Sequence, residues 1–191
     1  MFLSNNELQK IGFKSLGTNV LISNKVSIYG AEFISIGDNV RIDDFCILSG
    51  KITFGNNIHI GAGSVVIGGG GGNDNVSVTF ADFSGISSKC AIYATTKVFC
   101  DFNKANPMMI DFKKDSIADK SIYIGKHCVV GTGSTILPGA NLAEGVAVSA
   151  MSLVFGETKP WRTYFGNPAK IIAHRNKHIL VLEQQFLKEN D

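Results

Sequence analysis

The stretch GNNIHIGAGSVVIGGGGG, residues 55–72, decides the fold of this chain. Its large apolar side chains do not recur every 3.6 residues, as they would on the buried face of a helix, and strict alternation does not run for long. They recur every six residues instead. The fold must therefore need a large apolar side chain at every sixth position.

The six-residue period extends over most of the chain. Steps of six meet a large apolar residue every time in two long runs: Ile36, Ile42, Leu48, Phe54, Ile60 and Val66, and then Ile124, Val130, Ile136, Leu142, Val148 and Val154. Two shorter runs are Leu16, Ile22 and Ile28, and Phe80, Ile86 and Ile92. Small or β-branched side chains recur four places after the large ones. In a chain that is 45% hydrophobic, such regularity is not a chance pattern.

A six-residue unit makes physical sense as one short strand and one turn, stacked on copies of itself. The large residue fills the interior, and the small residue four places later packs near the corner. Three units close a triangular coil, and stacked coils give an all-β, parallel β-helix with a continuous core. We therefore expect the repeat residues to be core and the chemistry to come from departures from the repeat.

Composition favours a single domain whose charge is nearly balanced. The chain has 191 residues, with 18 Lys and Arg against 16 Asp and Glu, so neither nucleic acid nor a membrane is expected as a partner. The four cysteines show no CxxC and no metal-finger spacing, so no metal is expected. No signal peptide and no apolar run of about 18 residues is found, so a reduced, cytoplasmic chain is the default expectation.

The first departures from the repeat lie in the N-terminal half. SNNELQKIGF, residues 4–13, predicts a short capping helix, since Ser4 and Glu7 have the spacing of a capping box. GGGGGNDN, residues 68–75, invites a phosphate interpretation, but the Lys-Ser/Thr of a P-loop does not follow it. The favoured alternative is a flexible turn or a loop that borders the substrate site.

Two further departures follow. A long excursion over about 97–115 is typical of a functional loop in a compact repeat protein. After it, the C-terminal segment has Pro168 where the first turn of a helix would begin, with Ile172, Ile179, Leu182 and Phe186 on one apolar face. We therefore predict a β-helix domain over 1–166 and a C-terminal helix over 167–191.

Together, the repeats, the excursion and GNPAK at residues 166–170 resemble the hexapeptide-repeat acyltransferases, which fold as left-handed parallel β-helices. IGKHCVVGTGSTILPGANLAEGVAVSAMSLV (124–154) and PWRTYFGNPAKII (160–172) resemble the galactoside and maltose acetyltransferase branch. IGFKSLGTNVLIS (11–23) and IGDNVRIDDFCILSG (36–50) are similar to a bacterial surface-polysaccharide subgroup. That subgroup includes enzymes that acetylate dTDP-4-amino-4,6-dideoxyglucose for O-antigen synthesis.

The resemblance implies a homotrimer that transfers an acetyl group from acetyl-CoA to a sugar, with each site between two prisms. It implies that Ala150 and Ser152 line the pantetheine arm. It also implies that the nucleotide end of CoA meets Gly166, Asn167, Pro168, Ala169 and Lys170, with Lys170 available to a phosphate. Trp161 is expected either to flank the adenine or to pack at the junction of prism and helix.

The family's usual base is missing. In the galactoside and maltose branch a histidine ends the segment that matches IYATTKV, residues 92–98, and here Lys97 takes its place. A lysine is normally protonated near neutral pH, so it is a poor base. No histidine lies in the excursion. We keep Lys97 as a candidate acceptor-binding residue.

His59 is the candidate catalytic base. It lies five residues after Phe54, on the outward face of a coil, where it could take a proton from the acceptor; a structural interface histidine is the alternative. Asp43 and Asp44 are candidates for holding the acceptor, with a solvated turn as the alternative. His127 falls at a turn position and is expected to be exposed.

The remaining histidines point to no metal site. His174 and His178 are spaced by one helical turn, but no third ligand accompanies them, so a solvated helix face is favoured. A γ-type carbonic anhydrase has this fold but needs three zinc-binding histidines, whereas His59 and His127 are isolated on the prism. A non-catalytic scaffold would explain the repeats but neither GNPAK nor the excursion.

The absence of a loop histidine favours an amine acceptor, because a neutral amine is already a good nucleophile and a hydroxyl is weak without a base. We therefore predict acetylation of an amino group, and the resemblance implies that this group belongs to a dTDP-linked amino-deoxy sugar. The alternative is O-acetylation of a sugar hydroxyl, as in the galactoside branch.

Overall fold

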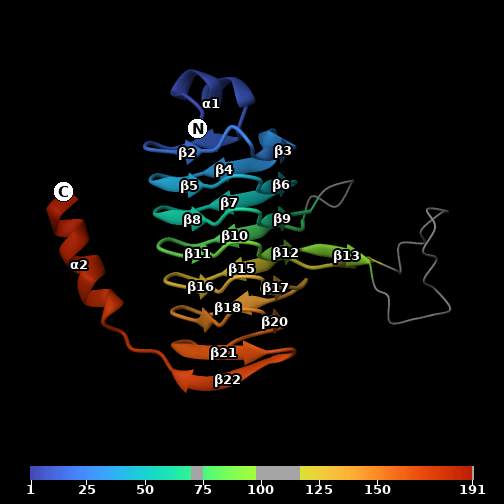
Figure 1. Ribbon diagram of the computed structural model, residues 1–191, viewed down its shortest axis with the longest axis vertical. Coiled ribbons are helices and arrows are strands. Elements are labelled where there is room, and N and C mark those ends of the chain that lie inside the picture. Colours follow the sequence, from blue (N-terminus) through green and yellow to red (C-terminus); the bar gives the residue numbers. More distant parts are fainter. Residues whose placement is uncertain (70–74, 98–116, 191) are drawn as a thin grey trace.

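The structure is a computed structural model that describes residues 1–69, 75–97 and 117–190. The chain winds as a triangular prism whose coils are stacked along the long axis, and the strands of successive coils pair in parallel (Figure 1). The predicted all-β, left-handed parallel β-helix is confirmed. The prediction for the excursion falls outside the described residues beyond Lys97, as does most of the glycine-rich loop.

Three sheets form the sides of the prism. The first sheet contains β1 (Ser15–Leu16), β4 (Ile34–Ile36), β7 (Ile52–Phe54), β10 (Val78–Phe80), β15 (Ile122–Ile124) and β18 (Asn141–Leu142). The second contains β2 (Leu21–Ile22), β5 (Val40–Ile42), β8 (Ile58–Ile60), β11 (Gly85–Ile86), β16 (Val129–Val130), β19 (Ala147–Val148), β21 (Arg162–Gly166) and β22 (Ala169–His174). The third contains β3 (Ser27–Tyr29), β6 (Ile47–Ser49), β9 (Val65–Ile67), β12 (Ala91–Tyr93), β17 (Thr135–Ile136) and β20 (Leu153–Val154).

Short elements lie outside the three sides. The helices are α1 (Asn5–Ile11), the 3₁₀ turn η1 (Ala31–Phe33) and α2 (Ile179–Asn190). A separate antiparallel pair, β13 (Thr95–Lys97) and β14 (Ile117–Asp119), leaves the prism where the excursion begins and ends. None of the helices described is long and apolar enough to cross a membrane.

The repeat residues form the core, as the period predicts. Register aligns each large residue with its equivalent one coil away, so that Ile36 pairs with Phe54, Phe54 with Phe80, and Phe80 with Ile124. The Phe54 and Phe80 rings stack with centroids 5.1 Å apart. The small residues four places later are also buried, among them Cys46, Ser64, Cys128, Ser134 and Ala140. A continuous apolar column therefore runs through the prism.

The turns are held by a side-chain ladder as well as by backbone bonds. Asn19, Asn39 and Asn57 occupy the same corner of successive coils, each with a positive φ. Asn tolerates this left-handed conformation better than most residues. The Asn19 amide donates to Asn39 at 2.8 Å, and the Asn39 amide donates to Asn57 at 3.2 Å. This ladder fixes the corner from which β8 starts.

The N-terminal capping helix is confirmed. The backbone N–H of Ser4 donates to the Glu7 carboxylate at 2.8 Å, and the N–H of Glu7 donates to the Ser4 hydroxyl at 3.4 Å. The helix ends at Gly12, which has the left-handed conformation typical of a C-terminal cap. Leu8 is buried against the prism, so α1 covers the open end of the core.

At the C-terminus the prediction that a helix starts at Pro168 is wrong. Residues 162–174 form an antiparallel hairpin, β21 and β22, with Gly166 opposite Ala169 and a cis Asn167–Pro168 bond in its turn. The hairpin forms because β21 continues the second sheet by pairing with β19, which satisfies backbone groups that a helix would have to bond within itself. Only Ile179–Asn190 is helical.

The same correction applies to the residues expected on that helix. Ile172 lies on β22, so it does not share a helical face with Leu182 and Phe186. His174 ends β22 and His178 precedes α2, so these histidines are not one turn apart on a helix.

Candidate functional site

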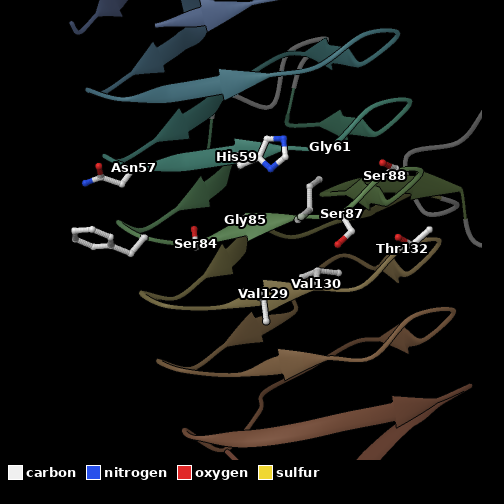
Figure 2. Close-up of a pocket in the computed structure, with 12 residues that line it drawn as sticks. Asn57, His59, Gly61, Ser84, Gly85, Ser87, Ser88, Val129, Val130 and Thr132 are labelled. Atoms are coloured by element: carbon white, nitrogen blue, oxygen red, sulfur yellow. The ribbon is translucent and has the colours of Figure 1, made fainter. Parts of the chain in front are cut away.

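A groove of about 510 Å³ lies on the outward face of the second sheet (Figure 2). The outward row of this face runs Arg41, His59, Gly85 and Val129 in register across β5, β8, β11 and β16. Gly85 has no side chain, so the row is open next to His59. The lining residues are Asn57, His59, Gly61, Phe83, Ser84, Gly85, Ile86, Ser87, Ser88, Val129, Val130 and Thr132.

His59 faces outward because of strand alternation. Its neighbours on β8, Ile58 and Ile60, are both buried in the core, so the side chain between them must point to the other face. The imidazole is 56% exposed and lines the groove. The predicted outward position of His59 is therefore what the structure shows.

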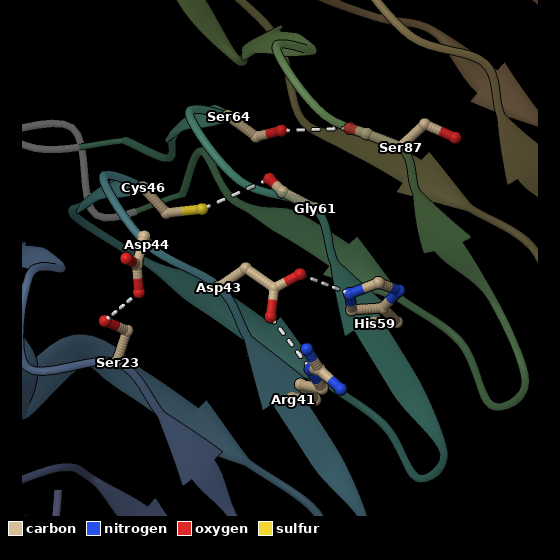
Figure 3. A network of polar contacts seen from close by, with 9 residues as sticks. All are labelled: Ser23, Arg41, Asp43, Asp44, Cys46, His59, Gly61, Ser64 and Ser87. Atoms are coloured by element: carbon tan, nitrogen blue, oxygen red, sulfur yellow. Dashed lines mark hydrogen bonds and ion pairs between the residues drawn. The ribbon is translucent and has the colours of Figure 1, made fainter. Parts of the chain in front are cut away.

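Asp43 contacts His59 directly (Figure 3). It lies in the turn after β5, where one carboxylate oxygen is 2.7 Å from Nε2 of His59 and the other accepts a hydrogen bond from Nε of Arg41 at 2.8 Å. Partial burial acts to raise the pKa of Asp43, but the hydrogen bonds from His59 and Arg41 outweigh it and hold the pKa below its ordinary value. Asp43 is therefore ionised at neutral pH.

Asp44 has different partners from its neighbour. One of its oxygens accepts from the Ser23 hydroxyl at 2.5 Å, and the other forms an ion pair with Lys25 at 2.9 Å. The hydrogen bonds from Ser23 and then Lys25 lower the pKa of Asp44. The structure thus brings Asp43, but not Asp44, to the histidine.

Lys97 is the last residue of β13, where it pairs with Ile117 of β14. Its side chain lies outside the described part of the structure. Its backbone places it at the root of the excursion, as the sequence predicts.

Hydroxyl groups in the groove were not among the sequence candidates. Ser87 and Thr132 line it beside His59, and the backbone N–H of Ser87 donates to the Val130 carbonyl at 2.8 Å. Among the described residues the Ser87 hydroxyl has no hydrogen-bond partner. The signal in the sequence is FSGISSK, residues 83–89, where small residues sit on both sides of a strand.

The GNPAK residues lie at the tip of the C-terminal hairpin. Gly166 ends β21 and Ala169 begins β22, with Asn167 and Pro168 in the turn between them. Lys170 is exposed. The hairpin belongs to the second sheet, the same sheet that carries His59.

Two predicted cofactor residues are buried. The Ser152 hydroxyl donates to the Ser149 carbonyl at 2.7 Å and accepts from the N–H of Gly166 at 3.2 Å, so it joins the prism to the hairpin. Trp161 is only 8% exposed and packs face-on against Gly145, with the Lys177 ammonium 5.5 Å from its ring centroid. The structure supports the packing alternative for Trp161. Ala150, by contrast, is exposed in a turn.

The expectation that His127 is exposed is wrong, since only 2% of it is accessible. Its Nε2 lies 2.9 Å from the Glu183 carboxylate of α2, and its ring stacks on Phe83 with centroids 5.5 Å apart. The Lys126 ammonium also pairs with Glu183, at 2.5 Å. The local sequence does not predict this burial, because the partner residue Glu183 lies more than fifty residues away along the chain.

No protein-family model matches the chain. Among curated proteins, it is 40% identical over 188 residues to dTDP-4-amino-4,6-dideoxy-D-glucose acyltransferase from Escherichia coli, covering 97% of this chain and 94% of the relative. The chain belongs to the hexapeptide-repeat sugar acyltransferases. It is also 29% identical over 172 residues to the putative lipopolysaccharide biosynthesis O-acetyl transferase WbbJ of E. coli K12, with 85% and 80% covered.

Among solved structures, the chain is similar to AntD, an N-acyltransferase from Bacillus cereus. The TM-score is 0.91 with 43% sequence identity, over 98% of this chain and 97% of that one. AntD has been solved with dTDP and 3-hydroxybutyryl-CoA, and a variant of it with dTDP-4-amino-4,6-dideoxyglucose and coenzyme A. The family resemblance predicted from the sequence is confirmed, and the chain is an acyltransferase.

Proposed function

We propose that this acyltransferase moves an acetyl group from acetyl-CoA to the amino group of a dTDP-linked amino-deoxy sugar, in the synthesis of surface polysaccharide such as O-antigen. The E. coli relative is named for that sugar nucleotide, and a variant of AntD has been solved with it and coenzyme A. The acyl donor supplies its acetyl group as a thioester, which is already activated for attack by an amine.

The observation that carries the proposal is that His59 and the GNPAK hairpin share one face of the prism. From β8 to β21 the second sheet runs through β11, β16 and β19. Adjacent strands lie about 4.8 Å apart, so the two regions are separated by roughly 19 Å. That span suits an extended pantetheine arm, with the thioester at the groove and the nucleotide at the hairpin.

The residues along this span suit such a ligand. The outward row between groove and hairpin is Gly85, Val129, Ala147 and Thr163, which presents no charged and no aromatic side chain. Lys170 at the hairpin offers a cation to a phosphate. Ala150 and the hairpin residues remain the proposed cofactor contacts, and any contribution from Ser152 would come from its backbone.

At the groove, His59 is the proposed base and takes the proton that the amine loses as it attacks. Backbone N–H groups near the groove would stabilise the negative charge that develops on the carbonyl oxygen. Lys97 and Asp44 remain proposed acceptor-binding residues, whereas Asp43 is engaged with His59.

We also infer a cytoplasmic homotrimer. Apolar side chains are exposed on two sides of the prism, at Leu21 and Val129 of the second sheet and at Ile47 of the third, and packing between prisms would cover them. The buried Cys46, Cys90 and Cys128 are free thiols, which fits a reducing compartment. Light scattering on the purified chain tests the assembly, and a mass of one chain would reject it.

The second candidate is O-acetylation of a sugar hydroxyl. The similarity to WbbJ favours it, and so does His59, because a hydroxyl acceptor needs a base more than an amine does. The same site would serve either acceptor.

The experiment is thiol release from acetyl-CoA, measured with dTDP-4-amino-4,6-dideoxyglucose and, in parallel, with a galactoside. Release with the amino sugar alone is expected. Release with the galactoside alone would move the chain to the O-acetyltransferases and reject the amine proposal.

A further inference from the structure

The two ring nitrogens of His59 have different surroundings. Nε2 is 2.7 Å from the Asp43 carboxylate, whereas Nδ1 has no hydrogen-bond partner among the described residues. Figure 3 shows the ring turned edge-on to the carboxylate, with one nitrogen towards it and the other away. Because the ring lines the groove and is 56% exposed, Nδ1 is accessible to a ligand there.

Asp43 determines which nitrogen carries the proton. An ionised carboxylate only accepts hydrogen bonds, so Nε2 must be the donor in this contact. A neutral imidazole carries one N–H, so its lone pair is then on Nδ1. The tautomer with a basic Nδ1 follows from the geometry.

The carboxylate itself is held in place. Arg41 donates from Nε to the oxygen that His59 does not use, at 2.8 Å. The side chain of Asp43 is 20% exposed, against 55% for Arg41 and 56% for His59, so it is the most enclosed member of the three. On the other side of β8, β11 places the uncharged Gly85 opposite the histidine. Among the described residues, Arg41 on β5 and Asp43 in the turn after it are thus the charged groups that face the ring.

We propose that Asp43 is a positioning residue that holds His59 with its proton on Nε2, so that Nδ1 is the nitrogen that receives the acceptor's proton. The part that concerns the acceptor rests on the function proposed above. The amine nitrogen forms the C–N bond with its lone pair, and the C–S bond breaks with its electrons left on sulfur. The ammonium proton passes to Nδ1 and then to the thiolate, which restores the neutral ring.

The imidazolium that forms in this sequence lies against Asp43, whose negative charge stabilises it. Asp43 therefore acts twice through His59, first by orienting the neutral ring and then by balancing its charge.

Nitrogen NMR of the chain with ¹⁵N-labelled histidine tests the proposal without relying on activity. The chain has four histidines, and the signals that vanish in His59→Gln identify those of His59. At pH 8 the proton is expected on Nε2. In Asp43→Ala both tautomers are expected, whereas Asp44→Ala, which changes the neighbouring carboxylate, should leave the His59 signals as in the parent chain. A proton on Nδ1 in the parent chain, or no change in Asp43→Ala, would overturn the proposal.

Kinetics then separate this inference from the proposed function. Asp43→Ala is expected to lower kcat for the amino sugar by about tenfold or more with little change in KM, since removing a group that orients a base weakens the chemical step. Full activity in His59→Ala would refute the role of Nδ1 even if the NMR result held. If the parent chain acylates no sugar, the proposed function is rejected. The NMR comparison of the parent chain with Asp43→Ala would still show whether Asp43 holds the proton of His59 on Nε2.

Discussion

At His59, two adjoining strands and one turn supply the groups that surround the ring. Burial of Ile58 and Ile60 sends the imidazole outward, the turn after β5 brings Asp43 to Nε2, and Gly85 on β11 leaves the space beside it open. A base, its orienting carboxylate and room for a substrate are therefore combined on one face of the prism.

Removing the imidazole should weaken catalysis and leave binding intact. His59→Ala is expected to lower kcat for the acceptor by about a hundredfold to ten-thousandfold, the usual contribution of a general base. The loss should be greater for a hydroxyl acceptor than for an amine. Steady-state kinetics of the parent chain and of His59→Ala check this. The same kcat in both would show that the base lies elsewhere.

Gly85 should not tolerate a side chain. A Cβ at this position would lie 2.8 Å from the His59 carbonyl oxygen, so β8 and β11 would have to move apart. A displacement of about 1 Å at a reacting group costs roughly a hundredfold in rate. We expect Gly85→Ala to lose activity on that scale while Ser35→Ala, on the first sheet, keeps it. Parent-like kinetics in Gly85→Ala would contradict this view of the groove.

The six-residue repeat predicts whether a side chain on a strand points into the core or outward. The outward position of His59 follows from its place five residues after Phe54. The burial of His127 could not be predicted in this way, because it depends on α2 packing over the turn rather than on the local sequence. The contact of Asp43 with His59 joins neighbouring coils, so it needs the register of β5 and β8.

At the scale of elements, polar and aromatic contacts attach α2 to the prism. Glu183 pairs with His127 and Lys126, and Phe186 meets Phe83 edge-on with ring centroids 6.0 Å apart. Before the helix, Arg175 donates to the carbonyls of His127, at 2.5 Å, and Gly145, at 3.1 Å. These contacts predict that the docking of α2 on the prism depends on the charge of Glu183.

Acid should loosen α2. Partial burial acts to raise the pKa of Glu183, but hydrogen bonds from Lys126 and His127 outweigh it and lower the pKa below its ordinary 4.5. A lowered folded-state pKa means that the ionised form stabilises the docked helix above pH 4.5, and that this stabilisation is lost as the pH falls through the folded-state value. Trp161 is the single tryptophan and packs beside His127, so its fluorescence should report the change.

Glu183→Gln is expected to remove this acid transition in the fluorescence, and Glu189→Gln on the same helix should retain it. An unchanged transition in Glu183→Gln would show that another group holds the helix.

At the C-terminus, pairing with the second sheet overrode the local preference for a helix. Pro168 suits a helix start, but the open edge of β19 offered backbone partners to residues 162–166, and the chain formed a hairpin instead. The capping box of α1 was predictable because both of its partners lie within four residues of each other.

At the scale of the whole molecule, the fold was predictable because each coil repeats one rule. The large residues of successive coils stack in register, so a single period in the sequence specified the core, the three sides and the parallel pairing. The proposed homotrimer and the choice of acceptor have no comparable signal in the repeat, because they would depend on surface residues and on contacts between chains.

Because the large residues of successive coils pack on one another, removing one of them should destabilise the prism. Phe80 is fully buried and packs between the coils of Phe54 and Ile124, so Phe80→Ala is expected to cost about 3–5 kcal/mol of unfolding free energy. Thr79→Ala, one residue away and outside the core, should cost little. Thermal denaturation measures both, and similar effects of the two changes would contradict the stacked-core account.

Product analysis decides whether the amine of a dTDP-linked sugar accepts the acetyl group. Purified chain, acetyl-CoA and dTDP-4-amino-4,6-dideoxyglucose are incubated together, and the sugar nucleotide is examined by mass spectrometry before and after mild alkali. We expect the gain of one acetyl group that survives alkali, as an amide does. An acetyl group removed by alkali, and thus an ester on a hydroxyl, would contradict it.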